Sequence, residues 1–176
     1  FEKECLRVDA SGQLAQTRHP ASLGSKLTHP WITTDYSESL LEFITPPSHD
    51  PAFALDFLRD VHRYTARNLN GELMWAGSMP CLLGDDADIP LADYGSSNSA
   101  RIKYVYREGL GHRYGRHMQT IAGVHYNWSL PEAFWTDLYT CCSAHGSLQD
   151  FISERYFGLI RNFMRYSWLI PYLFGA

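Results

Sequence analysis

The first nine residues of the chain place two carboxylates one residue apart. In "FEKECLRV", Glu2 and Glu4 stand among apolar and basic neighbours. The alternating pattern and Val8 predict a β-strand over residues 1–9. Successive side chains of a strand point to opposite faces, so the two glutamates would share one face and repel each other. The fold must therefore either leave this pair in water or neutralise it.

The composition is that of a globular protein. The 176 residues suffice for one domain with a sizeable core, and 45% are apolar, 19% charged and 14% aromatic. A net charge of −4 with both signs interspersed argues against a nucleic-acid partner. There is no run of about 18 apolar residues, so we expect no membrane span. The chain starts inside a predicted strand and stops on the apolar "PYLFGA", which indicates a fragment of a longer protein.

The four cysteines form no C-x-x-C pair and show no zinc spacing. We therefore expect free thiols in a reducing cytoplasm, each buried and inert. They are Cys5, Cys81, Cys141 and Cys142.

The rest of the chain mixes extended and helical patterns, which predicts an α+β fold. A strand is predicted over residues 38–45, and a helix in "DPAFALDFLRDVHRYTARNL" with Asp50 as its cap. "RIKYVYREGLGHRYGRHM" is helix-like but interrupted by three glycines, and "QTIAGVHYNWSLP" predicts another strand. A short helix is expected over residues 131–138 and a long one from Ser147 to before Pro171.

Acidic residues gather on these predicted strands and their edges. Glu38 and Glu42 would share a face if their segment is extended, as would His125 and Asn127. Buried carboxylates are costly unless they are paired or bind a metal, and oxygen ligands suit Mg²⁺ or Mn²⁺. The alternative, which is favoured for any single residue, is an acid solvated on the polar face of an antiparallel sheet. His125 alone is better explained as a histidine satisfied by ordinary hydrogen bonds.

Common nucleotide motifs are absent. The chain has no G-x-x-x-x-G-K-[ST] phosphate loop and no G-x-S-x-G elbow. "GLGHRYG" fails as a dinucleotide fingerprint, because it follows no strand and its glycine spacing is wrong. Any ATP would be held through metals and basic side chains.

Long ordered runs of the sequence resemble one enzyme family. They include "EKECLRVDASGQLAQTRHPASLGSKLTHPWITTDYSESLLEFITPP", "YGSSNSARIKYVYREGLGHRYGRHMQTIAGVHYNWSLP" and "IRNFMRYSWLIPYLFGA". They resemble the amino-terminal region of bacterial glutamate–cysteine ligase, and the similarity covers essentially the whole chain. The resemblance implies a glutamine-synthetase-like curved antiparallel sheet flanked by helices, here one partial domain over residues 1–176. It also implies ligation of the γ-carboxyl of L-glutamate to L-cysteine, driven by ATP with Mg²⁺ or Mn²⁺, by a monomer in the cytoplasm.

The same resemblance assigns roles to particular residues. It implies these metal ligands: Glu2, Glu4, Asp35, Glu42 and His125. It implies these substrate-binding residues: Tyr36, Tyr106, Arg107, Leu110, Gln119 and Ile121. For Tyr106 and Leu110, packing in the core is an equal alternative. Glu38 is not carried over, and we expect it to face solvent.

Two other functions compete with the ligase. The family's enzymes are about three times longer, so the chain could be a non-catalytic remnant that binds metal or nucleotide. A metal-dependent hydrolase could use the same carboxylates, but the chain lacks a compact ligand motif such as H-E-x-x-H.

Overall fold

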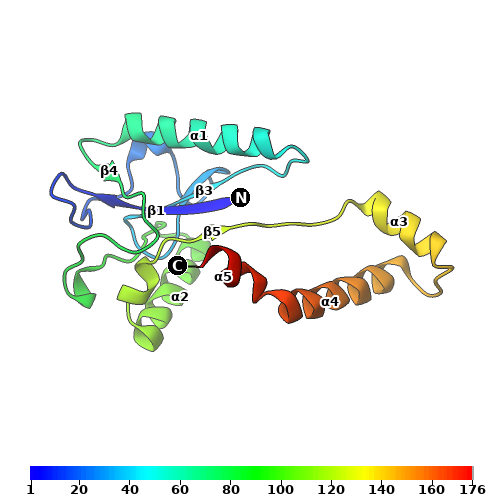
Figure 1. Ribbon diagram of the computed structural model, residues 1–176. Helices are drawn as coiled ribbons and strands as arrows, with labels where there is room; N and C mark the ends of the chain where they lie inside the picture. Colours follow the sequence, from blue (N-terminus) through cyan, green and yellow to red (C-terminus); the bar gives the residue numbers. More distant parts are fainter. Residues whose placement is uncertain (176) are drawn as a thin grey trace. The chain divides into compact units, whose positions relative to one another are not determined.

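The computed structural model describes residues 1–175 and forms two compact units (Figure 1). The first unit is Phe1–Asn127 and the second begins at Trp128. That both belong to one partial domain stays a prediction. Within the described residues, no helix combines the length and the apolar character needed to cross a membrane.

The first unit is built around an open antiparallel sheet, which confirms the predicted α+β class. Strand β1 (Glu2–Val8) lies at its centre and pairs with β3 (Leu40–Ile44) on one side. On the other side it pairs with β4 (Leu73–Met74) at one end and β5 (Val124–His125) at the other. Strand β2 (Ile32–Thr34) extends the sheet beyond β3. The amino-terminal strand therefore touches three of the other four.

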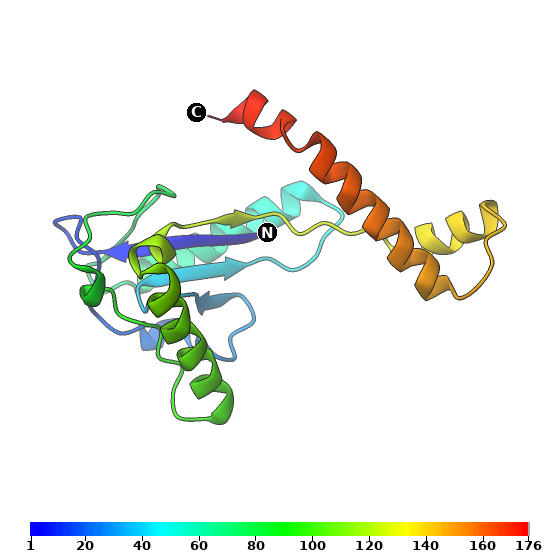
Figure 2. The same cartoon turned by 90° about the horizontal axis from the view of Figure 1, so that it is seen from below.

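Helices α1 (Pro51–Asn68) and α2 (Asn98–Tyr114) lie on opposite sides of this sheet (Figures 1 and 2). Cys5, Leu41 and Phe43 pack on the α1 side, where Leu58 and Val61 of that helix meet them. The alternate residues of β1 and β3 face the other side, and Leu6 and Leu40 form a second core cluster there with Leu110 of α2 packed against it. Glu2 and Glu4 precede Leu6 on that same face.

Helix α1 confirms the sequence prediction at its start. The Asp50 carboxylate accepts a hydrogen bond from the Ala52 amide at 2.9 Å, and Pro51 occupies the first helical position. Helix α2 corrects the expected interruption, because it runs through Gly109 and Gly111 without a break and ends at Gly115 with φ of 78°. One interior glycine costs only about 1 kcal/mol, so a well-capped helix continues through it.

The predicted strands are shorter than expected. β3 begins at Leu40 rather than at residue 38, and β5 contains only Val124 and His125. Its length is limited because β5 pairs only with Glu2 and Lys3 at one end of β1. Three short 3₁₀ helices, η1 (Ala21–Leu23), η2 (Asp86–Asp88) and η3 (His117–Thr120), complete the first unit.

The second unit is helical, with α3 (Glu132–Cys141), α4 (Leu148–Tyr166) and α5 (Leu169–Phe174). Trp135 of α3 stacks against Tyr156 of α4, with their ring centroids 4.8 Å apart. The predicted long helix is split after Tyr166, and Pro171 lies inside α5. A proline fits in the first turn of α5, because its missing N–H would have no partner within the helix.

The cysteines are all free, as predicted. Cys5 and Cys81 are buried, but Cys141 and Cys142 are exposed at the end of α3, which corrects the expectation for this pair. Cys141 is the last residue of α3 and Cys142 caps it, whereas the buried residue of this helix is Trp135.

Candidate functional site

Strand pairing brings four of the five predicted metal ligands onto neighbouring positions of one sheet face. Glu4 of β1 lies directly opposite Glu42 of β3, and Glu2 lies opposite His125 of β5. Asp35 follows β2 immediately, and its amide donates to the Leu40 carbonyl at 3.0 Å. The first strand is therefore the element on which the site is assembled.

Two hydrogen bonds tie the β5 segment to Glu2. The Asn127 side-chain amide donates to Glu2 Oε1 at 2.8 Å, and His125 Nδ1 lies 3.2 Å from Glu2 Oε2. Glu4 is held separately, since its Oε2 accepts from the Gly123 amide at 2.6 Å. Side chains alternate between faces in an extended segment, so Asn127 is expected on the same face as His125. Asn127 is not among the predicted site residues.

The electrostatics of the cluster are dominated by burial and by uncompensated negative charge. Burial, and after it the carboxylates of Asp35, Glu4 and Glu2, raise the pKa of Glu42 to about 7, while His125 opposes them. Burial also raises the pKa of Glu4, partly offset by its bond from the Gly123 amide. A cation placed here would favour the ionised form of each carboxyl group.

Glu38 does not face solvent, so that expectation is wrong. It is 7% exposed, forms an ion pair with Lys26, and accepts hydrogen bonds at 2.8 Å from the amides of His19 and Asp93. The segment around it is a turn that precedes β3, so the shared face with Glu42 that requires extended backbone is also absent.

The cluster fits Mg²⁺ in chemistry, but not as a closed protein cage. Among residues 1–175, no three histidine, cysteine or acidic side chains come close enough together to enclose an ion. Mg²⁺ usually keeps several waters and takes only one or two carboxylates together with phosphate oxygens. Pairs such as Glu4 with Glu42 therefore suit ions shared with a phosphate ligand, and the oxygen-rich donor set disfavours a structural zinc site.

The predicted substrate-binding residues are divided between core and surface. Tyr36 is 1% exposed within the second core cluster, and Leu110 packs against that cluster. Tyr106 and Ile121 are exposed, and Gln119 is half-buried in η3. The structure brings Tyr36 and Leu110 together in the core and leaves Tyr106 and Ile121 on the surface.

Arg107, the sixth of these residues, is buried against Asp35. Its Nε donates to the Asp35 carbonyl at 2.6 Å, its Nη2 to Asp35 Oδ1 at 3.3 Å, and its Nη1 to the Lys103 carbonyl at 3.0 Å. Its guanidinium also lies 4.8 Å from the ring centroid of Tyr94. Tyr94 cannot be selected from the sequence, because it lies in a loop almost 60 residues after Asp35 and belongs to no recognisable motif.

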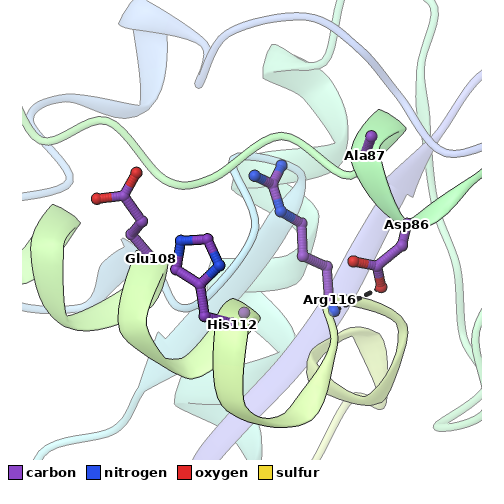
Figure 3. Close-up of a pocket in the computed structure, with 6 residues that line it drawn as sticks. Asp86, Ala87, Glu108, His112 and Arg116 are labelled. Carbon is purple, nitrogen blue, oxygen red and sulfur yellow. Dashed lines mark hydrogen bonds between the residues drawn. The ribbon is translucent and has the colours of Figure 1, made fainter.

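A cavity of about 340 Å³ lies elsewhere, between α2 and η2. Glu108, His112 and Arg116 border it from α2 and the turn that follows, opposite Asp86 and Ala87 (Figure 3). The Asp86 carboxylate is occupied, since it accepts from the amides of Arg116 and His117. The lining contains none of the predicted site residues.

The glutamate–cysteine ligase family model matches residues 1–176. The chain belongs to the glutamate–cysteine ligase family. It is 61% identical to the glutamate–cysteine ligase of Alcanivorax borkumensis and 60% identical to that of Saccharophagus degradans, in each case over the whole of this chain. It covers 34% and 33% of those proteins, so it spans about a third of the length of these relatives.

Solved structures agree with this family assignment. The crystal structure of glutamate–cysteine ligase from Francisella tularensis in complex with AMP is 43% identical, with a TM-score of 0.89 over 99% of this chain and 34% of that one. A bifunctional glutathione synthetase from Pasteurella multocida is 35% identical, with a TM-score of 0.87 over 98% of this chain and 22% of that one. The curved-sheet fold expected for this ligase family therefore has solved counterparts at close structural similarity.

Proposed function

We propose that this chain provides the metal-binding wall of an ATP-dependent ligase. The reaction joins the γ-carboxyl of L-glutamate to the amine of L-cysteine and yields γ-glutamylcysteine, ADP and phosphate. The observation that carries the proposal is the register that places Glu4 opposite Glu42 and Glu2 opposite His125 on one face. The family match and the AMP-bound relative support the choice of nucleotide and reaction.

The chemistry explains why such a wall is needed. A carboxylate is a poor electrophile, so the γ-carboxylate of glutamate first takes the terminal phosphoryl group of ATP and releases ADP. The cysteine amine then attacks the acyl phosphate, a C–N bond forms, phosphate leaves and the amine proton passes to solvent. Phosphoryl transfer depends mainly on positioning and charge neutralisation. When bound, Mg²⁺ supplies positive charge next to the phosphate oxygens.

This chain's residues have defined tasks in that scheme. Glu2, Glu4, Asp35, Glu42 and His125 would hold Mg²⁺ or Mn²⁺. Asn127 donates to Glu2 Oε1 and His125 Nδ1 lies 3.2 Å from Glu2 Oε2, so Glu2 and His125 are already held next to each other. The Gly123 amide occupies only Oε2 of Glu4, which leaves Glu4 Oε1 for a cation. Tyr36, Tyr106, Leu110, Gln119 and Ile121 remain proposed contacts to the amino-acid substrates, and a monomer in the cytoplasm remains part of the proposal.

The test uses this chain joined to the remaining two thirds of the Alcanivorax relative. ATP, Mg²⁺ and L-glutamate are supplied with and without L-cysteine, and phosphate release and γ-glutamylcysteine are measured. Glu2→Gln and Glu42→Gln are expected to lower Mg²⁺-dependent turnover about 10- to 100-fold, because each loses a carboxylate donor. Glu154→Gln, on the exposed surface of α4, is the matched control. Unchanged turnover in both site variants would refute the metal assignment.

A second function deserves the same assay, because the chain spans only a third of its relatives. The 176-residue chain by itself could bind metal or nucleotide without catalysis. Mn²⁺ and AMP binding by the chain, together with no product from the chain alone and none from the joined protein, would favour this non-catalytic function over the ligase.

A further inference from the structure

Asp35 is held in place by two residues that come from outside the sheet. Its segment follows β2 directly, and its side chain is 44% exposed, so neither burial nor strand pairing fixes the carboxylate. Tyr94, from the loop before α2, and Arg107, from within α2, both reach this segment. The carboxylate therefore depends on distant residues for its orientation.

Tyr94 contacts the main chain on both sides of Asp35. Its side chain is largely buried, and its hydroxyl donates to the Thr34 carbonyl and lies 3.1 Å from the Asp35 carbonyl. The single hydroxyl proton bonds the Thr34 carbonyl, and the Asp35 carbonyl accepts from Arg107 Nε, so the main chain on both sides of Asp35 has little freedom to rotate.

Arg107 holds the main chain and the side chain of the same residue. One guanidinium nitrogen bonds the Asp35 carbonyl and another bonds its carboxylate Oδ1, while the third bonds the Lys103 carbonyl. The guanidinium also packs on the Tyr94 ring, a cation–π arrangement that links the two residues. Each of the three guanidinium nitrogens makes one of these bonds and the residue is 8% exposed, so three of its five N–H donors are committed to the protein rather than to a substrate carboxylate.

We propose that Tyr94 and Arg107 are positioning residues that orient the Asp35 carboxylate toward the cation. The inference rests on the proposed metal site and deepens it, since neither residue would touch the ion or the substrates. Asp35 Oδ1 is occupied by Arg107, so Oδ2 is the oxygen presented for binding. Under this inference, Arg107 supports a metal ligand instead of contacting a substrate.

The test measures Mn²⁺ binding by the 176-residue chain, using calorimetry or the loss of the free Mn²⁺ signal in electron spin resonance. Tyr94→Phe removes only the hydroxyl, and Arg107→Lys keeps the charge but loses the paired bonds. Each is expected to weaken Mn²⁺ affinity about tenfold, the size typical of residues that support metal ligands. Tyr64→Phe is the matched control, because its hydroxyl also bonds a main-chain carbonyl, that of Ser22, far from the cluster.

A double-variant cycle separates positioning from general stability. If Tyr94 acts through Asp35, then Tyr94→Phe costs little further Mn²⁺ affinity once Asp35→Asn is present. A purely structural tyrosine would lower the affinity by the same factor in both backgrounds. Thermal unfolding followed by circular dichroism verifies that each variant folds, and Arg107→Lys provides the same cycle if Tyr94→Phe does not fold.

The outcomes are distinct. The inference is supported if both variants bind Mn²⁺ more weakly and if this weakening disappears once Asp35→Asn is present. Normal Mn²⁺ binding by both variants refutes it and leaves the proposed function intact. Absence of Mn²⁺ binding by the unaltered chain overturns the metal site and this inference together.

Discussion

Glu42 is the residue at which burial and like charge act in the same direction. Its pKa rises from the ordinary 4.5 to about 7, first through burial and then through Asp35, Glu4 and Glu2. A carboxyl group with a higher pKa in the folded state binds protons more tightly when folded. Its contribution to stability is therefore complete below pH 4.5 and is lost as the pH rises through about 7.

Glu42→Gln is expected to remove this loss of stability. Without divalent cations, the variant should be more stable than the unaltered chain by about 2 kcal/mol at about pH 8, and about equal to it near pH 4.5. The figure is below the full value of the pKa shift, because solvent reaches part of the carboxylate. Urea unfolding at both pH values measures the difference. Glu154→Gln should leave the free energy of unfolding nearly unchanged at both pH values. An equal gain in that variant would contradict the explanation from the raised pKa of Glu42.

Glu38 and Glu42 mark the limit of what the residues alone reveal. Glu38 is buried and Glu42, four positions later, is half-buried. Glu38 is neutralised by Lys26 and two backbone amides, whereas Glu42 lacks such a partner and lies among like charges. The resemblance distinguished them as metal ligand and non-ligand. The pattern could not, because the partners of Glu38 lie 12 to 55 residues away and are fixed only by the fold.

At the scale of elements, α2 contains two glycines with opposite environments. A Cβ added at Gly109 would meet nothing within 4 Å, whereas one at Gly111 would lie 2.6 Å from the Tyr36 hydroxyl oxygen. Tyr36 belongs to the core and cannot move away without disturbing its neighbours. The helix thus tolerates a side chain at one glycine and excludes it at the other.

Gly109→Ala is expected to stabilise the protein by about 0.5–1 kcal/mol, because alanine is the better helix former. Gly111→Ala should instead destabilise it by about 1–3 kcal/mol through the clash in the core. Thermal unfolding of the two single variants measures both signs. In a Tyr36→Phe background the Gly111→Ala cost should largely vanish, and a persistent cost would mean that the hydroxyl is not its cause.

The sequence predicted elements well where local signals agreed. Asp50, Pro51 and an apolar stripe all indicated α1, and that helix is where they placed it. β5 was overestimated, because its extent depends on how much of β1 remains unpaired rather than on its own residues. The break after Tyr166 differs from the prediction because a proline can either end one helix or lie in the first turn of the next, and Pro171 lies in the first turn of α5.

At the scale of the molecule, the proposed metal site and the hydrophobic core belong to the same unit. The core clusters on the two faces of the sheet consist of residues before Asn127, and so do the five proposed ligands. The second unit instead rests on aromatic contacts between α3 and α4, such as Trp135 with Tyr156. The two units therefore differ in how they are stabilised and in what they can bind.

A chain ending at Asn127 is accordingly expected to fold and to keep its Mn²⁺ affinity within about twofold, because independent regions contribute separately. Cooperative thermal unfolding tests the fold, and calorimetric titration with Mn²⁺ tests the site. A peptide of residues 128–176 serves as the control and should bind Mn²⁺ at least about tenfold more weakly, since it contains none of the proposed ligands. If the shortened chain folds but loses its affinity, the second unit supplies a ligand or orders the first, and the assignment of the metal site to the sheet alone is wrong.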